Sequence, residues 1–517
     1  MLRIVVAAAA VIAWTLCVTA IEHELATWAP AVAWRRIALI NGAVAIGIVL
    51  AIHLATLSRS GRWFGGAFAA VVAVSLALIP VNVRGPGTVI WVVCDTLRAD
   101  RMSLYGHGRE TSPFFEEWAP ELLVFDQGYS QASHTIVSAP AILASLYPST
   151  HGLRDYHDVL DSRAVLVSEA LQNAGFTTFG VLSNPHLSAK NGFNQGFDQF
   201  KSTKKWKNLS SAKVNQSFFD WRIRHTDGTP YFALLWYIDP HTPFQWDEEA
   251  SDWAGLDPGQ SFRFRPDDVT ESASEEIRKS TSRRYDASVR AVDNALRNLT
   301  AFLQEVDDYD DALIVFTSDH GESMWEHGRF GHNYGLYESL THVPLAIRFP
   351  SPLRFPYTTP PTGRSEMIVS SVDLLPTTLD FLGIEADSSL QGRSILPSLG
   401  GSDPGVAYLE QRLERYGPYH VFGLREGRHK YIWVESFEDN RLPRMLLFDL
   451  AADPGEQHNI ISEQPDLAAS FHARVVEQRR KYEALALERA TVSPDRESRK
   501  LLEKLGYIEE KDAADGR

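Results

Sequence analysis

Three long stretches without a charged residue open the chain. They cover residues 4–21, 37–58 and 63–83 and are rich in Ala, Val, Leu and Ile. A helix needs about 20 apolar residues to cross the hydrocarbon core of a bilayer. The pattern therefore predicts three transmembrane helices within residues 1–84. The first stretch is the shortest, and a cleaved signal peptide is the alternative interpretation of it.

The charges beside these stretches indicate an orientation. The short second connector is purely basic, with Arg59 and Arg62, whereas the first connector, residues 22–36, also carries acidic residues. Basic connectors tend to face the cytoplasm, which favours a cytoplasmic N-terminus. Three crossings then place residues 85–517 outside the cytoplasm, in a periplasmic, extracellular or lumenal compartment. We therefore expect a multi-pass membrane protein with an extracytoplasmic catalytic domain.

The pattern changes after residues 85–87, a Gly-Pro-Gly hinge. Continuous apolar runs at 88–94, 176–182, 231–237 and 312–317 are typical of buried strands in a parallel sheet. Helical periodicity lies between them, at 162–174 and 282–306. This alternation predicts an α/β fold over residues 85–400, with a mostly parallel sheet sandwiched by helices.

A different pattern follows in residues 401–517. Short strands are predicted at 405–409, 419–425, 430–434 and 445–449, and a charged helix is predicted at 464–490. We interpret this part as a small C-terminal α+β subdomain.

The composition limits the possible binding partners and the possible disulfide bonds. The net charge is −15, which argues against nucleic acid as a partner. The two cysteines are Cys17, inside a predicted membrane helix, and Cys94, at the end of a predicted strand. They give no disulfide framework, so an exported domain has to rely on its own core.

Acidic residues follow two of the predicted strands. Asp95 comes directly after the run 88–94, and Asp319 and His320 follow the run 312–317. Ligands gather beyond the carboxyl ends of parallel strands, and converging carboxylates repel each other unless a cation or proton intervenes. Two Asp and one His suit manganese or zinc better than calcium. We predict one divalent ion here, with magnesium and calcium as alternatives. Taken singly, Asp95 could equally cap a loop, and His320 could be an ordinary buried histidine.

Several segments resemble the signature segments of the sulfatase family, in the alkaline phosphatase superfamily. They are 93–100 (VCDTLRAD), 237–244 (YIDPHTPF), 317–322 (TSDHGE), 327–332 (HGRFGH), 337–344 (YESLTHVP), 429–432 (HKYI) and 447–456 (LFDLAADPGE). The resemblance covers about residues 87–460 in the family's order. It implies an alkaline-phosphatase-like fold and a metal-dependent enzyme that acts on an anionic ester.

The nucleophile segment departs from the formylglycine-dependent sulfatases. The segment 143–148 (LASLYP) aligns with the end of their motif, and counting back places Thr135 at the nucleophile position and Ala139 where Arg is expected. Threonine cannot be oxidised to formylglycine. The segment is similar instead to the phosphoglycerol and phosphoethanolamine transferases, in which an unmodified Thr is both nucleophile and metal ligand. The resemblance thus adds Thr135 to the metal ligands.

Pro140 leaves an alternative open. Proline favours the first turn of a helix, and a helix that starts at Pro140 leaves Thr135 upstream of it. Moving the motif to Ser138-Ala-Pro140 would make Ser138 the nucleophile. Both hydroxyls could also be plain helix caps.

The resemblance also assigns roles to four further residues. His241 and His332 would protonate the departing alcohol, because histidine titrates near neutral pH. Asn184 and His186 match a family position that contacts the anion, where a Lys usually stands.

The resulting hypothesis is a membrane-anchored metalloenzyme that cleaves or transfers a phosphate ester through a covalent intermediate on Thr135. The substrate would be an anionic ester, such as a lipid head group or an envelope glycan. One alternative is a sulfuric ester hydrolase. Another is an inactive membrane protein that keeps the fold for binding.

Overall fold

The structure is a computed structural model. It describes residues 87–202, 210–257, 273–332, 334–351, 361–399, 401, 403–413, 419–436, 444–494 and 496–504. The three predicted transmembrane helices lie outside these ranges. Within these ranges, no helix is both long and apolar enough to cross a membrane.

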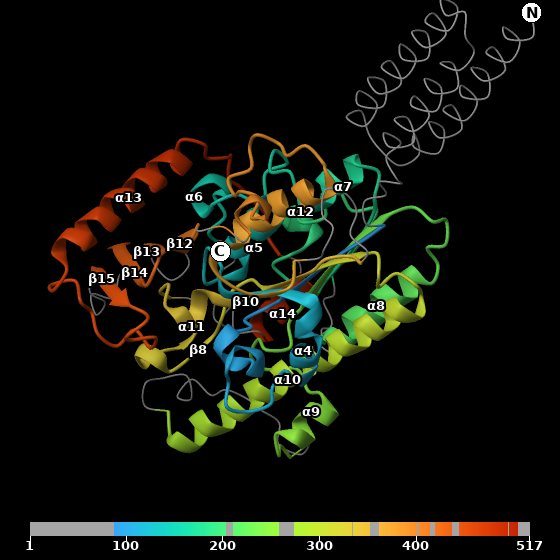
Figure 1. Cartoon of the computed structure of the whole chain (residues 1–517), viewed down its shortest axis with the longest axis horizontal. Coiled ribbons are helices and arrows are strands. Elements are labelled where there is room, and N and C mark those ends of the chain that lie inside the picture. The colour runs from blue at the N-terminus through green and yellow to red at the C-terminus, as the bar shows by residue number, and fades with distance from the viewer. Residues whose placement is uncertain are drawn as a thin grey trace, which may run out of the picture. The chain divides into compact units, whose positions relative to one another are not determined.

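A large sheet forms the centre of the described part of the chain (Figure 1). Its eight strands follow the order β11-β2-β10-β7-β1-β6-β4-β5, and β10 alone runs against the others. The strands are β1 (Thr88–Cys94), β2 (Leu122–Tyr129), β4 (Thr177–Leu182), β5 (Gln199–Ser202), β6 (Tyr231–Tyr237), β7 (Ala312–Ser318), β10 (His342–Arg348) and β11 (Gly363–Ser370). The predicted mostly parallel sheet is confirmed.

The four predicted strands are β1, β4, β6 and β7, whose observed bounds match or differ by one residue. The sequence pattern missed β2, β5, β10 and β11. Two of these have interrupted patterns: β10 contains a proline, Pro344, and the first half of β11 is largely exposed and polar. Strands without a continuous apolar run give a weak local signal.

Helices cover both faces of the sheet. Alternate residues of β1 belong to separate cores, with Trp91 in one and Val92 in the other. The Trp91 core includes α5 (Thr135–Ala144), α7 (Val167–Asn173) and α12 (Leu374–Leu382). The Val92 core includes α4 (Pro113–Trp118), α8 (Ser211–Arg222) and α10 (Glu275–Glu305). This arrangement confirms the predicted sandwich.

The helix α10 begins earlier than the prediction of 282–306. Ser274 caps it by accepting a hydrogen bond from the Ile277 amide at 3.3 Å, and Glu275 and Glu276 occupy the first turn. Serine at the cap and acidic residues in the first turn both stabilise a helix start. The first turns carry mainly exposed polar residues, so hydrophobic periodicity alone did not reveal them.

A second sheet follows the first in sequence. It is antiparallel and contains β12 (Val406–Leu413), β13 (Tyr419–Glu426), β14 (His429–Ser436) and β15 (Met445–Asp449). The helix α13 (Pro465–Glu483) packs on one face through Phe471 and Val475. It ends before the predicted residue 490, and residues 490–491 instead form β16 (Ala490–Thr491), which pairs with β3 (Asp158–Val159). A short helix, α14 (Arg496–Lys504), comes next.

Candidate active site

Two neighbouring strands bring Asp95 and Asp319 together. β1 and β7 are paired in parallel, with Cys94 opposite Ser318, so the next residue of each strand lies at the same edge. The Asp319 amide donates to the Cys94 carbonyl at 3.3 Å, and the Thr96 amide donates to Asp319 Oδ1 at 3.2 Å. Both carboxylates are fully buried. The predicted convergence of these strand-end carboxylates is therefore found in the structure.

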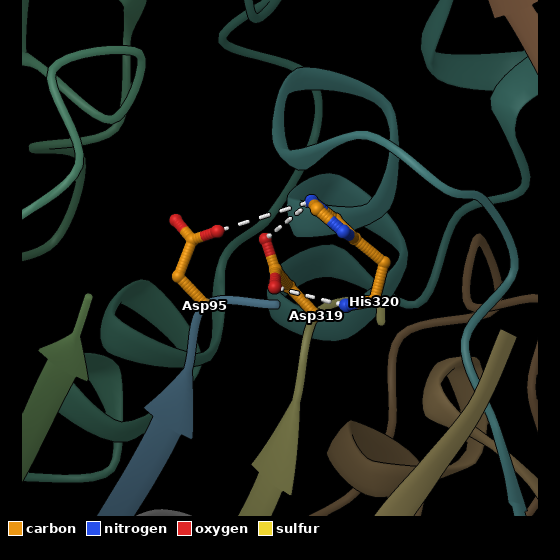
Figure 2. A group of neighbouring side chains, drawn as sticks. All are labelled: Asp95, Asp319 and His320. Atoms are coloured by element: carbon orange, nitrogen blue, oxygen red, sulfur yellow. Dashed lines mark hydrogen bonds and ion pairs between the residues drawn. The ribbon is translucent and has the colours of Figure 1, made fainter. Parts of the chain in front are cut away.

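His320 faces the same point (Figure 2). Its Nδ1 lies 2.8 Å from the Gly321 carbonyl, which can only accept, so Nδ1 carries the hydrogen. Its Nε2 lies 3.5 Å from Asp319 Oδ2 and 3.9 Å from Asp95 Oδ1. Burial lowers the pKa of His320 to about 3, so the ring is neutral. A neutral imidazole with its second nitrogen held by a carbonyl is the usual form of a metal-ligating histidine.

The donor atoms of Asp95, Asp319 and His320 fit a metal ion. They lie within 4.8 Å of one another. Among the described residues, Asp95 Oδ1 and Asp319 Oδ2 are buried without a hydrogen-bond partner. Burial, and then the charge of Asp95, raises the pKa of Asp319 well above its usual value. A bound cation would satisfy both oxygens and remove this repulsion.

Thr135 is the first residue of α5 and reaches this group. Its Oγ1 lies 3.2 Å from His320 Nε2 and accepts a hydrogen bond from Asn184 Nδ2 at 3.2 Å. Ser138 lies one turn further along the helix, where its hydroxyl is 3.5 Å from the Thr135 carbonyl. Of the two hydroxyls considered from the sequence, the structure brings that of Thr135 to the acidic group.

The helix α5 corrects the expectation that Pro140 starts a helix. His134 is the N-cap residue, with its ring 3.4 Å from the Ile136 amide, and Pro140 lies inside the helix. Proline cannot donate to the carbonyl four residues earlier, so this position costs stability. Every residue of α5 is buried, and tertiary packing therefore outweighs the local preference of Pro140.

Asn184 links the nucleophile position to a carboxylate. It lies after β4, and its Nδ2 also donates to Asp95 Oδ2 at 2.5 Å. Its Oδ1 accepts from the His186 amide at 2.8 Å, which fixes the orientation of the side-chain amide. The ring of His186 lies 5.4 Å from that of His134. Both predicted residues therefore lie at the site, with Asn184 directly at Thr135.

The predicted His241 and His332 complete a group of histidine rings. The His332 ring centre lies 4.6 Å from that of His320 and 5.1 Å from that of His241. His332 Nδ1 lies 3.0 Å from Glu322 Oε1. Burial raises the pKa of Glu322 to about 8 and lowers that of His332 to about 3. At pH 7 this pair therefore carries no net charge.

The sequence motifs assigned no role to His134. Its ring lies 5.7 Å from that of His332, and burial, followed by the neighbouring His186, lowers its pKa well below 6.5. Its position directly before Thr135 was a usable signal, because neighbouring residues share their surroundings.

Two family models match the chain. The model described as Sulfatase matches residues 87–384, and the one described as N-sulphoglucosamine sulphohydrolase, C-terminal, matches residues 325–481. An N-acetylglucosamine-6-O-sulfatase of Bacteroides thetaiotaomicron is 33% identical over 187 residues, which is 35% of this chain and 32% of that protein. Arylsulfatase K of Mus musculus is 30% identical over 207 residues, 37% of this chain and 34% of that protein. The matched part of the chain thus spans about a third of the length of these curated relatives.

Solved structures share the fold. One, in complex with its substrate D-glucosamine-2-N,6-O-disulfate, has a TM-score of 0.64 at 19% identity and covers 77% of this chain and 98% of that chain. The phosphonate monoester hydrolase of Agrobacterium radiobacter has a TM-score of 0.62 at 20% identity and covers 79% and 100%. Identities this low establish the fold alone. Because the Sulfatase model spans more than half of the sequence, this chain belongs to the sulfatase family.

Proposed function

We propose that this chain is a metal-dependent hydrolase that cleaves a sulfate ester of a sugar, with Thr135 as the nucleophile. The observation that carries the proposal is the position of Thr135 Oγ1, 3.2 Å from His320 Nε2 and beside the Asp95 and Asp319 carboxylates. A hydroxyl needs such surroundings to become a nucleophile at neutral pH.

Asp95, Asp319, His320 and Thr135 would hold the ion, and manganese or zinc suits this mixture of oxygen and nitrogen donors. When bound, the divalent cation supplies the charge that lowers the pKa of the Thr135 hydroxyl and polarises the ester. Asn184 Nδ2 orients the Thr135 oxygen by donating to it. The N-terminus of α5, where Thr135 lies, favours negative charge on that oxygen.

The leaving alcohol needs a proton, and we assign its supply to the Glu322–His332 pair. With Glu322 protonated, its O–H donates to His332 Nδ1, so Nε2 carries the ring's own hydrogen. Transfer of that hydrogen to the leaving oxygen, together with movement of the Glu322 proton to Nδ1, keeps the ring neutral. His241, whose ring is 5.1 Å from that of His332, is the alternative donor.

The reaction would then proceed in two displacements. Thr135 releases its hydroxyl proton to solvent, and Oγ1 forms a bond to the central atom as the bond to the sugar oxygen breaks. Water next attacks the central atom, returns one proton to Thr135 Oγ1 and one to the Glu322–His332 pair, and the inorganic anion leaves. If an acceptor alcohol takes the place of water, the same step becomes a transfer.

Sulfate is the leading substrate because both curated relatives are named sulfatases, and one solved structure with this fold holds a sulfated glucosamine as its substrate. A phosphate ester is the second candidate substrate, because a threonine nucleophile differs from formylglycine in how its covalent intermediate is released. A formylglycine hydrate expels sulfate by elimination through its second hydroxyl, which a threonine lacks. Release by a second displacement at the central atom is familiar for phosphoryl groups. A phosphonate monoester hydrolase also shares the fold.

A matched pair of substrates tests whether the enzyme prefers a sulfate or a phosphate ester. The full chain, supplied with manganese or zinc, should cleave 4-nitrophenyl sulfate and 4-nitrophenyl phosphate at different kcat/KM, and the identical leaving group makes their ratio a property of the anion. Mass spectrometry should find the covalent adduct on the peptide that contains Thr135. An adduct on Ser138 would contradict the assignment of Thr135 as the nucleophile. Tight metal binding without turnover of either ester would favour the non-catalytic alternative.

We also propose that residues 1–84 anchor the enzyme in a membrane with the catalytic domain outside the cytoplasm. The three uncharged stretches support this, and they would keep the site near lipid head groups or envelope glycans. Protease added to intact spheroplasts should cut near residues 84–87. Protection until lysis would reverse the topology.

A further inference from the structure

We propose that the C-terminal sheet holds two metal ligands in place through a buried lysine, so that Lys430 and Glu456 are positioning residues of the active site. The inference rests on the proposed function, because it treats Asp319 and His320 as ligands of the ion. Lys430, Glu338 and Glu456 form what we call the lysine cluster. Each lies in one of the signature segments, 429–432, 337–344 and 447–456, to which the site itself assigns no role.

Lys430 carries a charge without access to solvent. It lies on β14 and is fully buried. Its Nζ lies 2.8 Å from Glu338 Oε1 and 3.2 Å from Glu456 Oε1, and it donates to Thr341 Oγ1 at 3.2 Å. Removal of one partner from such a group leaves a buried charge uncompensated, which is strongly unfavourable. The lysine cluster therefore joins β14 firmly to the short helix α11 (Glu338–Thr341) and to the loop after β15.

Glu456 also supports α11 directly. Its Oε2 accepts a hydrogen bond from the amide of Glu338, the first residue of α11, at 2.6 Å. The first amides of a helix have no partner within the helix, so this carboxylate satisfies one of them. The φ angle of Glu456 is 54°, in the left-handed region that residues other than glycine seldom adopt. An uncommon backbone conformation at a residue with two specific contacts fits a role in placing its carboxylate.

The helix α11 lies directly against the peptide that follows His320. The Leu340 carbonyl accepts from the Gly321 amide at 2.8 Å. A Cβ atom at position 321 would lie 2.1 Å from the Ser339 carbonyl oxygen, so only glycine fits this approach. The Gly321 carbonyl in turn lies 2.8 Å from His320 Nδ1. The position of α11 therefore sets the carbonyl that orients the His320 ring.

A second connection leads from α11 to Asp319. The Thr341 carbonyl accepts from the Ser130 amide at 2.9 Å, and the Ser130 hydroxyl donates to the Asp319 carbonyl. The Thr341 hydroxyl is itself held by Lys430. Two paths thus run from the lysine cluster to the backbone of two adjacent metal ligands. Loss of an outer partner of a metal ligand typically weakens metal binding about 10- to 100-fold.

Arg412 separates this role from plain stabilisation of the C-terminal sheet. It is a buried cation on β12 of the same sheet, 2.6 Å from Glu410 and 2.6 Å from Glu483. Neither partner belongs to α11. Arg412→Met should therefore destabilise the C-terminal sheet as Lys430→Met does, without reaching Gly321.

Two measurements on the full chain test the proposal. In Lys430→Met without metal, we expect the Gly321 amide to exchange hydrogen for deuterium at least tenfold faster, measured by mass spectrometry of the peptide that contains it. Calorimetry should show a Kd for manganese that is about 10- to 100-fold higher than in the wild type. Arg412→Met should lower the Tm and leave both values near those of the wild type.

A second pair of variants serves if Lys430→Met does not fold. Glu456→Gln keeps an oxygen for the Glu338 amide and Glu456→Ala does not, so the alanine variant should change the exchange rate and the Kd more.

Equal effects of Lys430→Met and Arg412→Met on either measurement would overturn the proposal, and so would equal effects of the two Glu456 variants. A wild type that binds no manganese would overturn both this inference and the proposed function. Neither measurement involves turnover. An enzyme that shows the expected changes but cleaves neither aryl ester would therefore overturn the proposed function alone.

Discussion

Replacement of Asp319 by Asn removes one of two buried carboxylates at the ends of β1 and β7. The substitution keeps the shape of the side chain. Asp319 Oδ1 accepts from the amides of Thr96 at 3.2 Å and His320 at 2.9 Å, and an Asn oxygen can accept both. Asp319 Oδ2 has no hydrogen-bond partner among the described residues, so an Asn amide at that position breaks no hydrogen bond. The variant therefore loses a negative charge and little else.

The spacing of the carboxylates gives the size of the effect. Their donor oxygens lie within 4.8 Å of each other. At an effective dielectric constant of about 20, two unit charges at this distance repel by about 3.5 kcal/mol. In a chelated protein this repulsion is relieved only by a proton, and the pKa of Asp319 is raised well above its usual value by burial and by Asp95. A folded-state pKa above the unfolded one makes the chelated wild type lose stability as pH rises.

Thermal unfolding of the full chain measures how much this repulsion destabilises the wild type. In chelator at pH 8, we expect Asp319→Asn to melt about 5 °C above the wild type, since each kcal/mol shifts the Tm of a large domain by about 2 °C or less. At lower pH the difference should shrink, because a proton on Asp319 then relieves the repulsion in the wild type. Manganese or zinc should raise the Tm of the wild type and leave that of Asp319→Asn nearly unchanged. Asp220→Asn, at an exposed aspartate of α8, controls for the general effect of removing a charge.

Two outcomes would refute this reasoning. If neither metal nor chelator changes the wild-type Tm, Asp95, Asp319 and His320 do not form a metal site. If Asp319→Asn gains as much from the metal as the wild type, the ion binds elsewhere.

Three further predictions concern the same region. Thr135→Ala should lower kcat at least about 1,000-fold in steady-state assays with the fold retained. Ser138→Ala should keep a kcat near that of the wild type, because the Ser138 hydroxyl lies 3.5 Å from the Thr135 carbonyl and not at the acidic group. Equal losses in both variants would contradict the assignment of Thr135 as the nucleophile. His332→Gln should lower kcat by about 100- to 10,000-fold with little change in KM, and an unchanged kcat would exclude it as the acid. His151 lies 3.0 Å from the Val137 carbonyl of α5, and burial lowers its pKa to about 3. Its stabilising effect should be complete above about pH 6.5 and fall by about 1.4 kcal/mol per pH unit below it, so His151→Asn should flatten the pH dependence of urea unfolding between pH 7 and 5.

The sequence by itself determined the elements that consist of a continuous run of apolar residues. β1 and β6 are runs of seven apolar or β-branched residues, and each was predicted with its observed bounds. A strand buried on both faces needs such a run whatever surrounds it. Parallel strands also end at one edge, so the pattern of runs by itself places Asp95 and Asp319 at the same end of the sheet.

Only the tertiary structure decided the surroundings of Thr135, the proposed nucleophile. Pro140 favoured a helix start by its own chemistry, yet α5 begins at Thr135 because the fully buried helix is held by its neighbours. Thr135 and His320 are 185 residues apart in sequence, and Asn184 reaches both Thr135 and Asp95 from a third segment. Local patterns encode which face of an element is buried, but not which distant element it faces. Packing of the whole sheet with its helices sets that choice, and with it the geometry of the site.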